Sequence, residues 1–99
     1  MIDKKINIAQ NPYTPVDILI RLATDDDWRV RFCVAENPNT PPSALVKLST
    51  DKDWDVRCNV AYNPHTPVDV LVKLLTDENS NVRIAVSYNP NTPANLLID

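Results

Sequence analysis

Hydrophobic positions along the chain fall into short segments with helical spacing, and these segments return every 26 residues. Leucines stand three positions apart at Leu19 and Leu22, Leu45 and Leu48, and Leu71 and Leu74. Valines stand four positions apart in the intervening segments, at Val30 and Val34, Val56 and Val60, and Val82 and Val86. Both spacings put side chains on one face of an α-helix. The pattern therefore predicts two short helices in every repeat, each with a buried face.

The apolar positions of the first helix in each repeat extend beyond the leucine pair. They include Ile18, Ile20, Ala44, Val46, Val70 and Val72. A helix that is apolar around most of its circumference is typical of a buried position in a protein. We therefore expect neighbouring elements to cover the first helices on both sides.

A five-residue phrase separates the second helix of one repeat from the first helix of the next. It reads NPYTP at residues 11–15, NPNTP at 37–41, NPHTP at 63–67 and NPNTP at 89–93. Asn-Pro should end the second helix, because the residue before a proline avoids the α conformation. The asparagine side chain should accept a hydrogen bond from the backbone two residues on, and Thr-Pro should start the next helix with threonine as its N-cap. The corner residues with an expected structural role are Asn11, Pro12, Thr14, Pro15, Asn37, Pro38, Thr40, Pro41, Asn63, Pro64, Thr66 and Pro67.

A polar turn joins the two helices of each repeat and contains Asp27, Asp53 or Asn79 where a side chain can cap the second helix. Two columns of charged residues are constant: Asp25, Asp51 and Asp77 in the turn, and Arg31, Arg57 and Arg83 in the second helix. We expect the arginines to bond the aspartates and the turn carbonyls between repeats. The alternative is an anion-binding strip. On the first helix, the spacing of Asp17–Arg21 and Asp69–Lys73 predicts surface ion pairs.

The period divides the chain into full units at 11–36, 37–62 and 63–88, with partial units at 1–10 and 89–99. A fixed period of this length is typical of a solenoid, in which each unit packs on its neighbours. We therefore predict an all-α fold in which residues 1–99 form a single repeat domain.

The units follow the pattern N-P-x-T-P-x-x-x-L-x-x-L-A-x-D-x-x-x-x-V-R-x-x-V-A, which residues 11–35 match closely. This pattern resembles that of the leucine-rich repeat variant family, and the resemblance covers essentially the whole chain. It implies a right-handed α-solenoid, a superhelix of HEAT-like repeats, in which one helix of each unit is sometimes of the 3₁₀ type. A founding member of the family resembles a repeat array attached to a cysteine cluster that holds an iron–sulfur centre. This chain lacks that cluster, so the resemblance implies no cofactor here.

The chain has few residues suited to catalysis or metal binding. Glycine is absent, which excludes the glycine-dependent phosphate and dinucleotide loops. The single histidine, His65, lies in a corner with no nucleophile close to it in the sequence. The two cysteines, Cys33 and Cys58, occupy different columns of the repeat and are too few for a disulfide framework or a zinc site. We expect reduced thiols, no metal, no cofactor and no enzymatic activity.

The net charge of the 99 residues is −3, whereas nucleic-acid-binding domains are usually basic. Nucleic acid is therefore not expected as the main ligand. No apolar run approaches the ~18 residues that span a bilayer, so no membrane partner is expected. The N-terminal segment MIDKKINIAQ has no apolar core of a secretory signal, which makes the cytoplasm the expected compartment.

Binding residues are expected in the columns that vary on this constant frame, since a solenoid encodes recognition there. On the second helices, the spacing i, i+4, i+7 predicts exposed rows Arg29–Cys33–Glu36, Asp55–Asn59–Tyr62 and Asn81–Ala85–Tyr88. Trp28 and Trp54 share a further column, and they either contact a partner, as tryptophan often does, or pack over the turns. The candidate partner-binding residues are Trp28, Arg29, Trp54, Asp55, Asn59, Tyr62, Asn81 and Tyr88.

These observations favour a non-enzymatic scaffold that binds another protein through the second-helix face. The alternative is a HEAT-like module associated with nucleic acid, which needs a basic strip from Arg29, Arg31, Arg57 and Arg83. A third hypothesis is a self-assembling repeat fragment. Its apolar residues Leu96, Leu97 and Ile98 would pack head to tail on a second copy, because solenoid ends normally need polar caps.

Overall fold

The structure is a computed structural model that describes residues 2–98 as two layers of short helices. The α-helices are α1 (Ile2–Gln10), α2 (Val16–Leu22), α3 (Trp28–Glu36), α4 (Pro42–Leu48), α5 (Trp54–Tyr62), α6 (Val68–Leu74) and α7 (Ser80–Tyr88), and a 3₁₀ helix, η1 (Ala94–Leu96), follows them. Residues 2–98 contain no strand. Equivalent helices begin 26 residues apart, so the predicted all-helical repeat architecture is confirmed. The right-handed sense of the solenoid stays a prediction.

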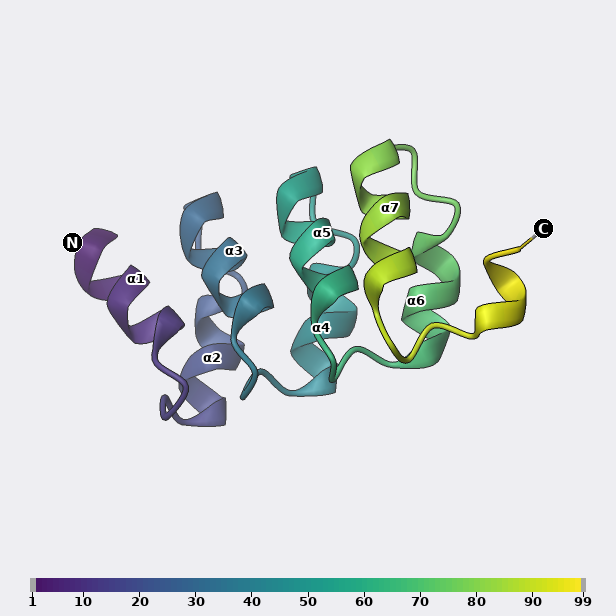
Figure 1. Cartoon of the computed structure of the whole chain (residues 1–99). Helices are drawn as coiled ribbons and strands as arrows, with labels where there is room; N and C mark the ends of the chain where they lie inside the picture. The colour runs from purple at the N-terminus through teal and green to yellow at the C-terminus, as the bar shows by residue number, and fades with distance from the viewer. Residues whose placement is uncertain (1, 99) are drawn as a thin grey trace.

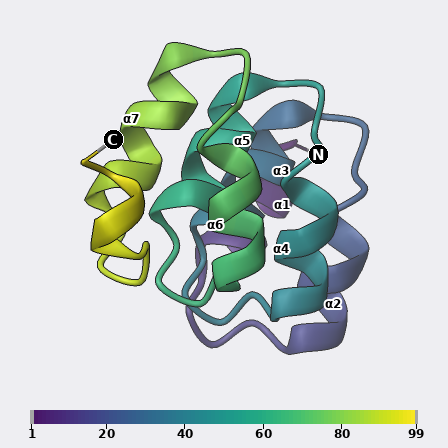
Figure 2. The same cartoon turned by 90° about the vertical axis from the view of Figure 1, so that its right-hand side faces the viewer.

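The odd-numbered and even-numbered helices form separate layers (Figures 1 and 2). α1, α3, α5 and α7, which carry the second-helix columns of the repeat, pack directly on one another along the stack. α2, α4 and α6 pack mainly on this odd-helix layer and form the even-helix layer. The molecule is elongated, 45 × 22 × 17 Å, with its N- and C-termini at opposite ends (Figure 1).

The hydrophobic core lies between the two layers. The even-helix layer contributes Leu19, Leu45 and Leu71, and the odd-helix layer contributes Val30, Val34, Val56, Val60, Val82 and Val86, all without exposed surface. Burying one such side chain stabilises the fold by roughly 1.5–3 kcal/mol. The buried faces predicted from leucine and valine spacing are thus confirmed, although Leu22 is only partly buried.

The even-numbered helices are not covered on both sides, so that prediction is wrong. Ile20, Val46 and Val72 are 41–46% exposed. The odd-helix layer covers one side of α2, α4 and α6, while solvent reaches the opposite side. The apolar residues around these helices predicted burial on both sides, but a fold of two layers buries only one side of each helix.

The threonines of the corners do not cap the helices that follow them. The hydroxyl of Thr40 donates to the Val34 carbonyl oxygen at 2.6 Å, and Thr14, Thr66 and Thr92 make the equivalent bond to the preceding helix. The N-cap of α4 is instead Pro41, which offers no side-chain hydrogen bond. The N-cap prediction is wrong because the last carbonyls of a helix also lack partners, and the threonine hydroxyl bonds one of these.

The corner asparagines make both a local turn and a bond between repeats. Oδ1 of Asn63 accepts a hydrogen bond from the His65 backbone N–H at 2.9 Å, as predicted. Nδ2 of Asn63 donates to the carbonyl oxygens of Ala35 at 2.9 Å and Asn37 at 3.1 Å, at the end of α3 and the start of the preceding corner. Asn37 and Asn89 repeat all three bonds one unit earlier and one unit later. We call this series the asparagine ladder.

The N-caps of the odd-numbered helices follow the prediction at two of three positions. The side chains of Asp27 and Asn79 accept hydrogen bonds from the backbone two residues on, at Arg29 and Asn81. Asp53 makes no such bond because its carboxylate accepts from Arg31 at 2.7 Å instead. An ion pair between repeats thus replaces a local cap.

Replacing Asn63 with alanine should lower the free energy of unfolding by roughly 2–4 kcal/mol. The change removes three hydrogen bonds from a buried side chain and withdraws the donor from two carbonyl groups. Urea denaturation followed by circular dichroism measures this difference. The control His65→Ala changes an exposed side chain in the same corner and should alter stability by less than ~0.5 kcal/mol. Equal stabilities of the two variants would contradict a role for the ladder.

Candidate functional site

The candidate aromatic side chains lie on the solvent side of the odd-helix layer. Trp28 and Trp54 are 42% and 44% exposed, and Tyr62 and Tyr88 are 51% and 71% exposed. The tryptophans begin α3 and α5, and the tyrosines end α5 and α7. The structure therefore presents large aromatic side chains at both ends of α5 and on the helices beside it.

Ring contacts hold several of these side chains in place. Tyr62 and Tyr88 stack across neighbouring repeats with their ring centroids 6.4 Å apart and an interplanar angle of 28°. Trp28 meets Phe32 of the same helix edge to face, with centroids 5.9 Å apart. Such contacts stabilise ring pairs by about 0.5–1.5 kcal/mol beyond burial. The two tyrosines thus form an ordered pair that bridges α5 and α7.

Two of the polar candidates are bonded within the structure. Arg29 donates to the Asp27 carboxylate through Nε at 3.1 Å and Nη2 at 2.8 Å. This hydrogen bond comes first among the causes that hold the pKa of Asp27 below its usual range. Nδ2 of Asn59 donates to the Phe32 carbonyl oxygen at 3.1 Å and so joins α5 to α3. Asn59 is consequently part of a helix junction as well as of the surface.

The solvent exposure predicted for the rows at i, i+4, i+7 is wrong for the middle residue of two rows. Cys33 is 6% exposed and Ala85 has no exposed surface. This column faces the preceding helix of the stack, as the bond from Asn59 demonstrates. Ile84, which lies outside the predicted rows, is 52% exposed. Its column holds Phe32 and Cys58 in the other repeats, so its apolar character indicated burial rather than exposure.

A shallow hollow of about 260 Å³ lies beside Tyr62. It is lined by Glu36 of α3, by Asn59 and Tyr62 of α5, and by the corner residues Asn63 and Pro64. Among residues 2–98, no ion pair engages Glu36, nor Asp55 at the start of α5. Asn81 at the start of α7 is exposed. The hollow thus combines an aromatic ring, an amide and a carboxylate.

The constant arginines and aspartates pair between repeats. Nε of Arg31 donates to Asp51 at 2.7 Å, and Nε of Arg57 donates to Asp77 at 2.9 Å. The same arginines donate through Nη1 to the carbonyl oxygens of Asp25 and Asp51, at 2.7 Å in both cases. Lys5 takes the arginine's place one repeat earlier and bonds Asp25 at 2.8 Å.

These ion pairs are largely withdrawn from solvent. Arg31 and Arg57 are 7% and 8% exposed. The side-chain hydrogen bond to Asp77 comes first among the causes that raise the pKa of Arg57. Burial works to raise the pKa of Asp77, but hydrogen bonds from Arg57 and the Asn79 backbone outweigh it and hold the pKa below the usual range.

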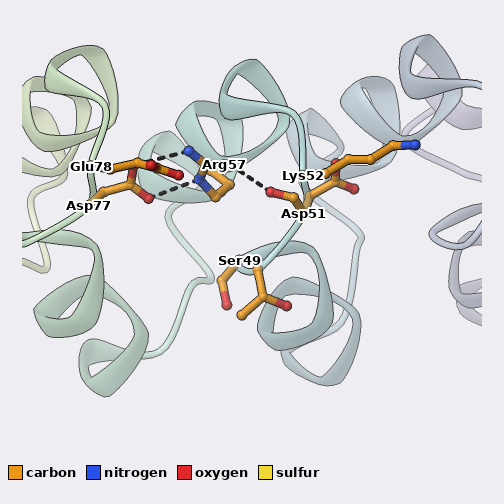
Figure 3. A pocket seen from close by; sticks show the side chains of 7 residues that line it. Ser49, Asp51, Lys52, Arg57, Asp77 and Glu78 are labelled. Atoms are coloured by element: carbon orange, nitrogen blue, oxygen red, sulfur yellow. Dashed lines mark hydrogen bonds and ion pairs between the residues drawn. The ribbon is translucent and has the colours of Figure 1, made fainter.

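Figure 3 shows the side chains that line an open hollow beside one of these ion pairs, with Arg57 lying between Asp77 and Asp51. Its volume is about 570 Å³, and its lining residues are Ser49, Thr50, Asp51, Lys52, Arg57, Asp77 and Glu78. The Asp77 carboxylate and the Asp51 carbonyl oxygen already accept hydrogen bonds from the guanidinium of Arg57, and acids outnumber bases in the lining. The arrangement does not favour the anion-binding strip considered from the sequence.

The basic strip required by the nucleic-acid hypothesis is fragmented. Arg31 and Arg57 are buried in ion pairs, and Arg29 bonds Asp27. Arg83 is exposed on α7 and donates to the Asp77 carbonyl oxygen. The four side chains therefore do not form a continuous exposed surface for phosphates.

Cys33 and Cys58 are free thiols, and both are buried. Burial comes first among the causes that raise the pKa of each thiol. Across residues 2–98, no cluster of three histidine, cysteine, aspartate or glutamate side chains is arranged to hold a metal ion. No helix in this part of the chain is long and apolar enough to cross a membrane.

Comparison with protein families matches the model described as Leucine rich repeat variant to residues 28–53 and 54–79. These two stretches cover just over half of the chain. Each begins at an odd-numbered helix and ends in the turn after an even-numbered helix, so it contains one complete corner. Searches of curated proteins and of solved structures gave no match.

Replacing Asp77 with asparagine should lower the free energy of unfolding at pH 7 by about 2–4 kcal/mol, because Arg57 loses its buried partner. The native pKa of Asp77 lies below its unfolded value. Its contribution to stability is therefore complete at neutral pH and is lost as the pH falls below about 4. Urea titrations between pH 7 and pH 2 should show a weaker acid dependence for Asp77→Asn than for the wild type. The control Asp26→Asn alters an exposed carboxylate, and an equal effect from it would contradict this account.

Both cysteines should react slowly with a thiol reagent such as DTNB in the folded protein. Their burial limits access, and their raised pKa values reduce the thiolate fraction at pH 7–8. Addition of urea should speed both reactions to the rate of a free thiol. Rapid reaction of either cysteine without denaturant would show that its helix junction opens readily.

Proposed function

Because the chain belongs to the leucine rich repeat variant family, we propose that this helical repeat scaffold binds another protein through its odd-helix layer. The observation that carries the proposal is the exposure of Trp28, Trp54, Tyr62 and Tyr88 on that layer. Tryptophan and tyrosine supply much of the binding energy at protein interfaces. Scaffolds of this family are generally non-catalytic, and the proposal involves no reaction.

The frame beneath these side chains supports recognition by a preformed surface. The asparagine ladder and the buried arginine pairs join consecutive repeats, so the aromatic side chains keep a fixed relation to one another. Tyr62 and Tyr88 already stack in the free protein. A partner would therefore meet an ordered surface, which reduces the entropy lost on binding.

The charges of the odd-helix layer favour a partner that contributes basic side chains. Glu36 and Asp55 make no ion pair with any of residues 2–98, while Arg29 is neutralised by Asp27. A lysine or arginine of the partner could enter the hollow beside Tyr62, where a carboxylate and an aromatic face lie together. Both groups attract a cation.

A capture experiment with paired variants tests this proposal. Immobilised wild-type protein and a Tyr62→Ala/Tyr88→Ala variant are incubated with a lysate of the source cell, and captured proteins are identified by mass spectrometry. The variant should remain folded, since both side chains are mostly exposed, and circular dichroism checks this. Its affinity for a specific partner should fall by roughly tenfold or more, as expected for the loss of interface hot spots.

A Tyr13→Ala variant is the matched control, because it removes an exposed tyrosine from a corner and not from the odd-helix layer. Its capture of the partner should equal that of the wild type. The variant Glu36→Lys should weaken capture of a basic partner, and the loss should be larger at low salt than at high salt because salt screens the charge repulsion. Full capture by the Tyr62→Ala/Tyr88→Ala variant, with loss in the control, would refute binding through the odd-helix layer.

A further inference from the structure

The even-helix layer carries a second ordered array of exposed apolar side chains. Each helix contributes two, spaced one turn apart: Val16 and Ile20 on α2, Pro42 and Val46 on α4, and Val68 and Val72 on α6. The five aliphatic members are 41–46% exposed. Exposed apolar patches of this kind commonly mark binding surfaces. The array lies on α2, α4 and α6, whereas the tyrosines of the proposed protein-binding face belong to α5 and α7 of the other layer (Figure 2).

A row of bases runs alongside this array. Arg21, Lys47 and Lys73 share one column of the repeat and are all exposed. The ion pairs expected from Asp17 to Arg21 and from Asp69 to Lys73 are absent from the structure. Exposed pairs of this kind gain little free energy. Within residues 2–98 no ion pair engages Arg21, Lys47 or Lys73, which leaves the three cations available to a ligand.

The junction of α2 and α4 has the geometry of a small binding groove. A hollow of about 220 Å³ is lined by Ile20 of α2, by Ala23 directly after this helix, and by Ser43, Ala44 and Lys47 of α4. Its walls are aliphatic, Ser43 adds a hydroxyl, and Lys47 is the charged member of the lining. The positions of Ser43 and Ala44 are taken by Asp69 and the larger Val70 on α6. The α2–α4 groove is thus more open than the junction of α4 and α6, and it attracts an anion more strongly.

We propose that the α2–α4 groove binds an acidic peptide segment of a partner protein. An aliphatic side chain of the peptide would sit between Ile20 and Ala44, and a neighbouring carboxylate would accept a hydrogen bond from Nζ of Lys47. This surface is separate from the odd-helix layer, so the inference does not depend on the proposed function. Charge complementarity identifies the occupant: an apolar groove with a cation at its rim selects an aliphatic residue next to an acid.

The charges around the array favour a peptide over an anionic membrane. Asp17 and Asp69 stand among the exposed side chains of this layer, and the whole chain has a net charge of −3. An anionic membrane would lie against the whole layer and be repelled by both carboxylates, whereas neither Asp17 nor Asp69 lines the α2–α4 groove that a peptide would enter. A groove that holds a single aliphatic side chain, by contrast, fits a peptide.

The lining of the groove sets the composition of the peptide. One aliphatic residue would fill the space between Ile20 and Ala44, and acids beside it would reach Lys47. The equivalent junction of α4 and α6 carries Asp69 and Val70 in place of Ser43 and Ala44. The expected ligand is therefore one aliphatic residue flanked by acids, bound at the α2–α4 groove.

Nuclear magnetic resonance titration of the ¹⁵N-labelled chain tests this proposal. The probe is a synthetic peptide that repeats Leu-Glu-Glu, and the comparison peptides repeat Leu-Gln-Gln and Leu-Lys-Lys. The acidic peptide should shift the amide signals of Ile20, Ala23, Ser43, Ala44 and Lys47 in a saturable manner. The glutamine peptide should bind the groove roughly tenfold more weakly, and the lysine peptide should leave the signals of these five residues unshifted.

Two variants of the groove and one control complete the test. Lys47→Glu reverses the cation, and Ser43→Asp places a carboxylate where α6 already carries Asp69, so neither change should disturb the fold. Each should weaken binding of the acidic peptide roughly tenfold. Lys52→Glu reverses an exposed lysine that is not part of the groove and should change the affinity less than about twofold.

Several results would overturn the proposal. Equal binding of the three peptides would show that the groove does not select by charge. Undiminished binding of the acidic peptide by Lys47→Glu would show that Lys47 does not take part. Shifts confined to the odd-helix layer, or no shift at all, would show that the groove is not a peptide site. Binding of anionic phosphatidylserine vesicles by the even-helix layer, without binding of the peptide, would assign the surface to a membrane instead.

Discussion

The rest of the structure depends on the corner asparagine, a buried side chain that uses both ends of its amide. Its oxygen fixes the turn that ends one helix, and its nitrogen bonds two carbonyls where the preceding odd-numbered helix ends, as at Asn63. Turn geometry and the stacking of repeats are therefore set by one residue. A side chain with only a donor or only an acceptor could satisfy one of these requirements but not both. The constant spacing of the helices follows from this double role.

Charge is organised on the same frame, with the constant ion pairs turned inward and the varied charges turned outward. Arg31 and Arg57 link consecutive turns and are nearly buried. The exposed charges differ between the layers: Glu36 lies with aromatic side chains, whereas Lys47 and its equivalents lie beside aliphatic ones. One repeat sequence thus builds two surfaces with different chemistry, because the two helices of a unit face opposite sides.

Local chemistry explains which features could be predicted from the sequence. The helices, their buried leucines and valines, and the turn at Asn63 follow from spacing and from bonds within a few residues. The role of Thr40 could not be predicted, because it depends on which of two helices offers the nearer unsatisfied group. The burial of Cys33 and the exposure of Val46 depend on how the layers rotate against each other. That rotation is set by packing over the whole stack, which a single repeat does not encode.

The acceptors of the asparagine ladder are backbone carbonyl oxygens, such as those of Ala35 and Asn37. Every amino acid has a carbonyl group, so this bond places no demand on the side chains of the neighbouring unit. A junction of this kind joins any repeat to any other that keeps the corner. Units with different surfaces could accordingly be exchanged, duplicated or reordered without redesign of the joint, and the order of surfaces along such a chain becomes a property that can change independently of its fold.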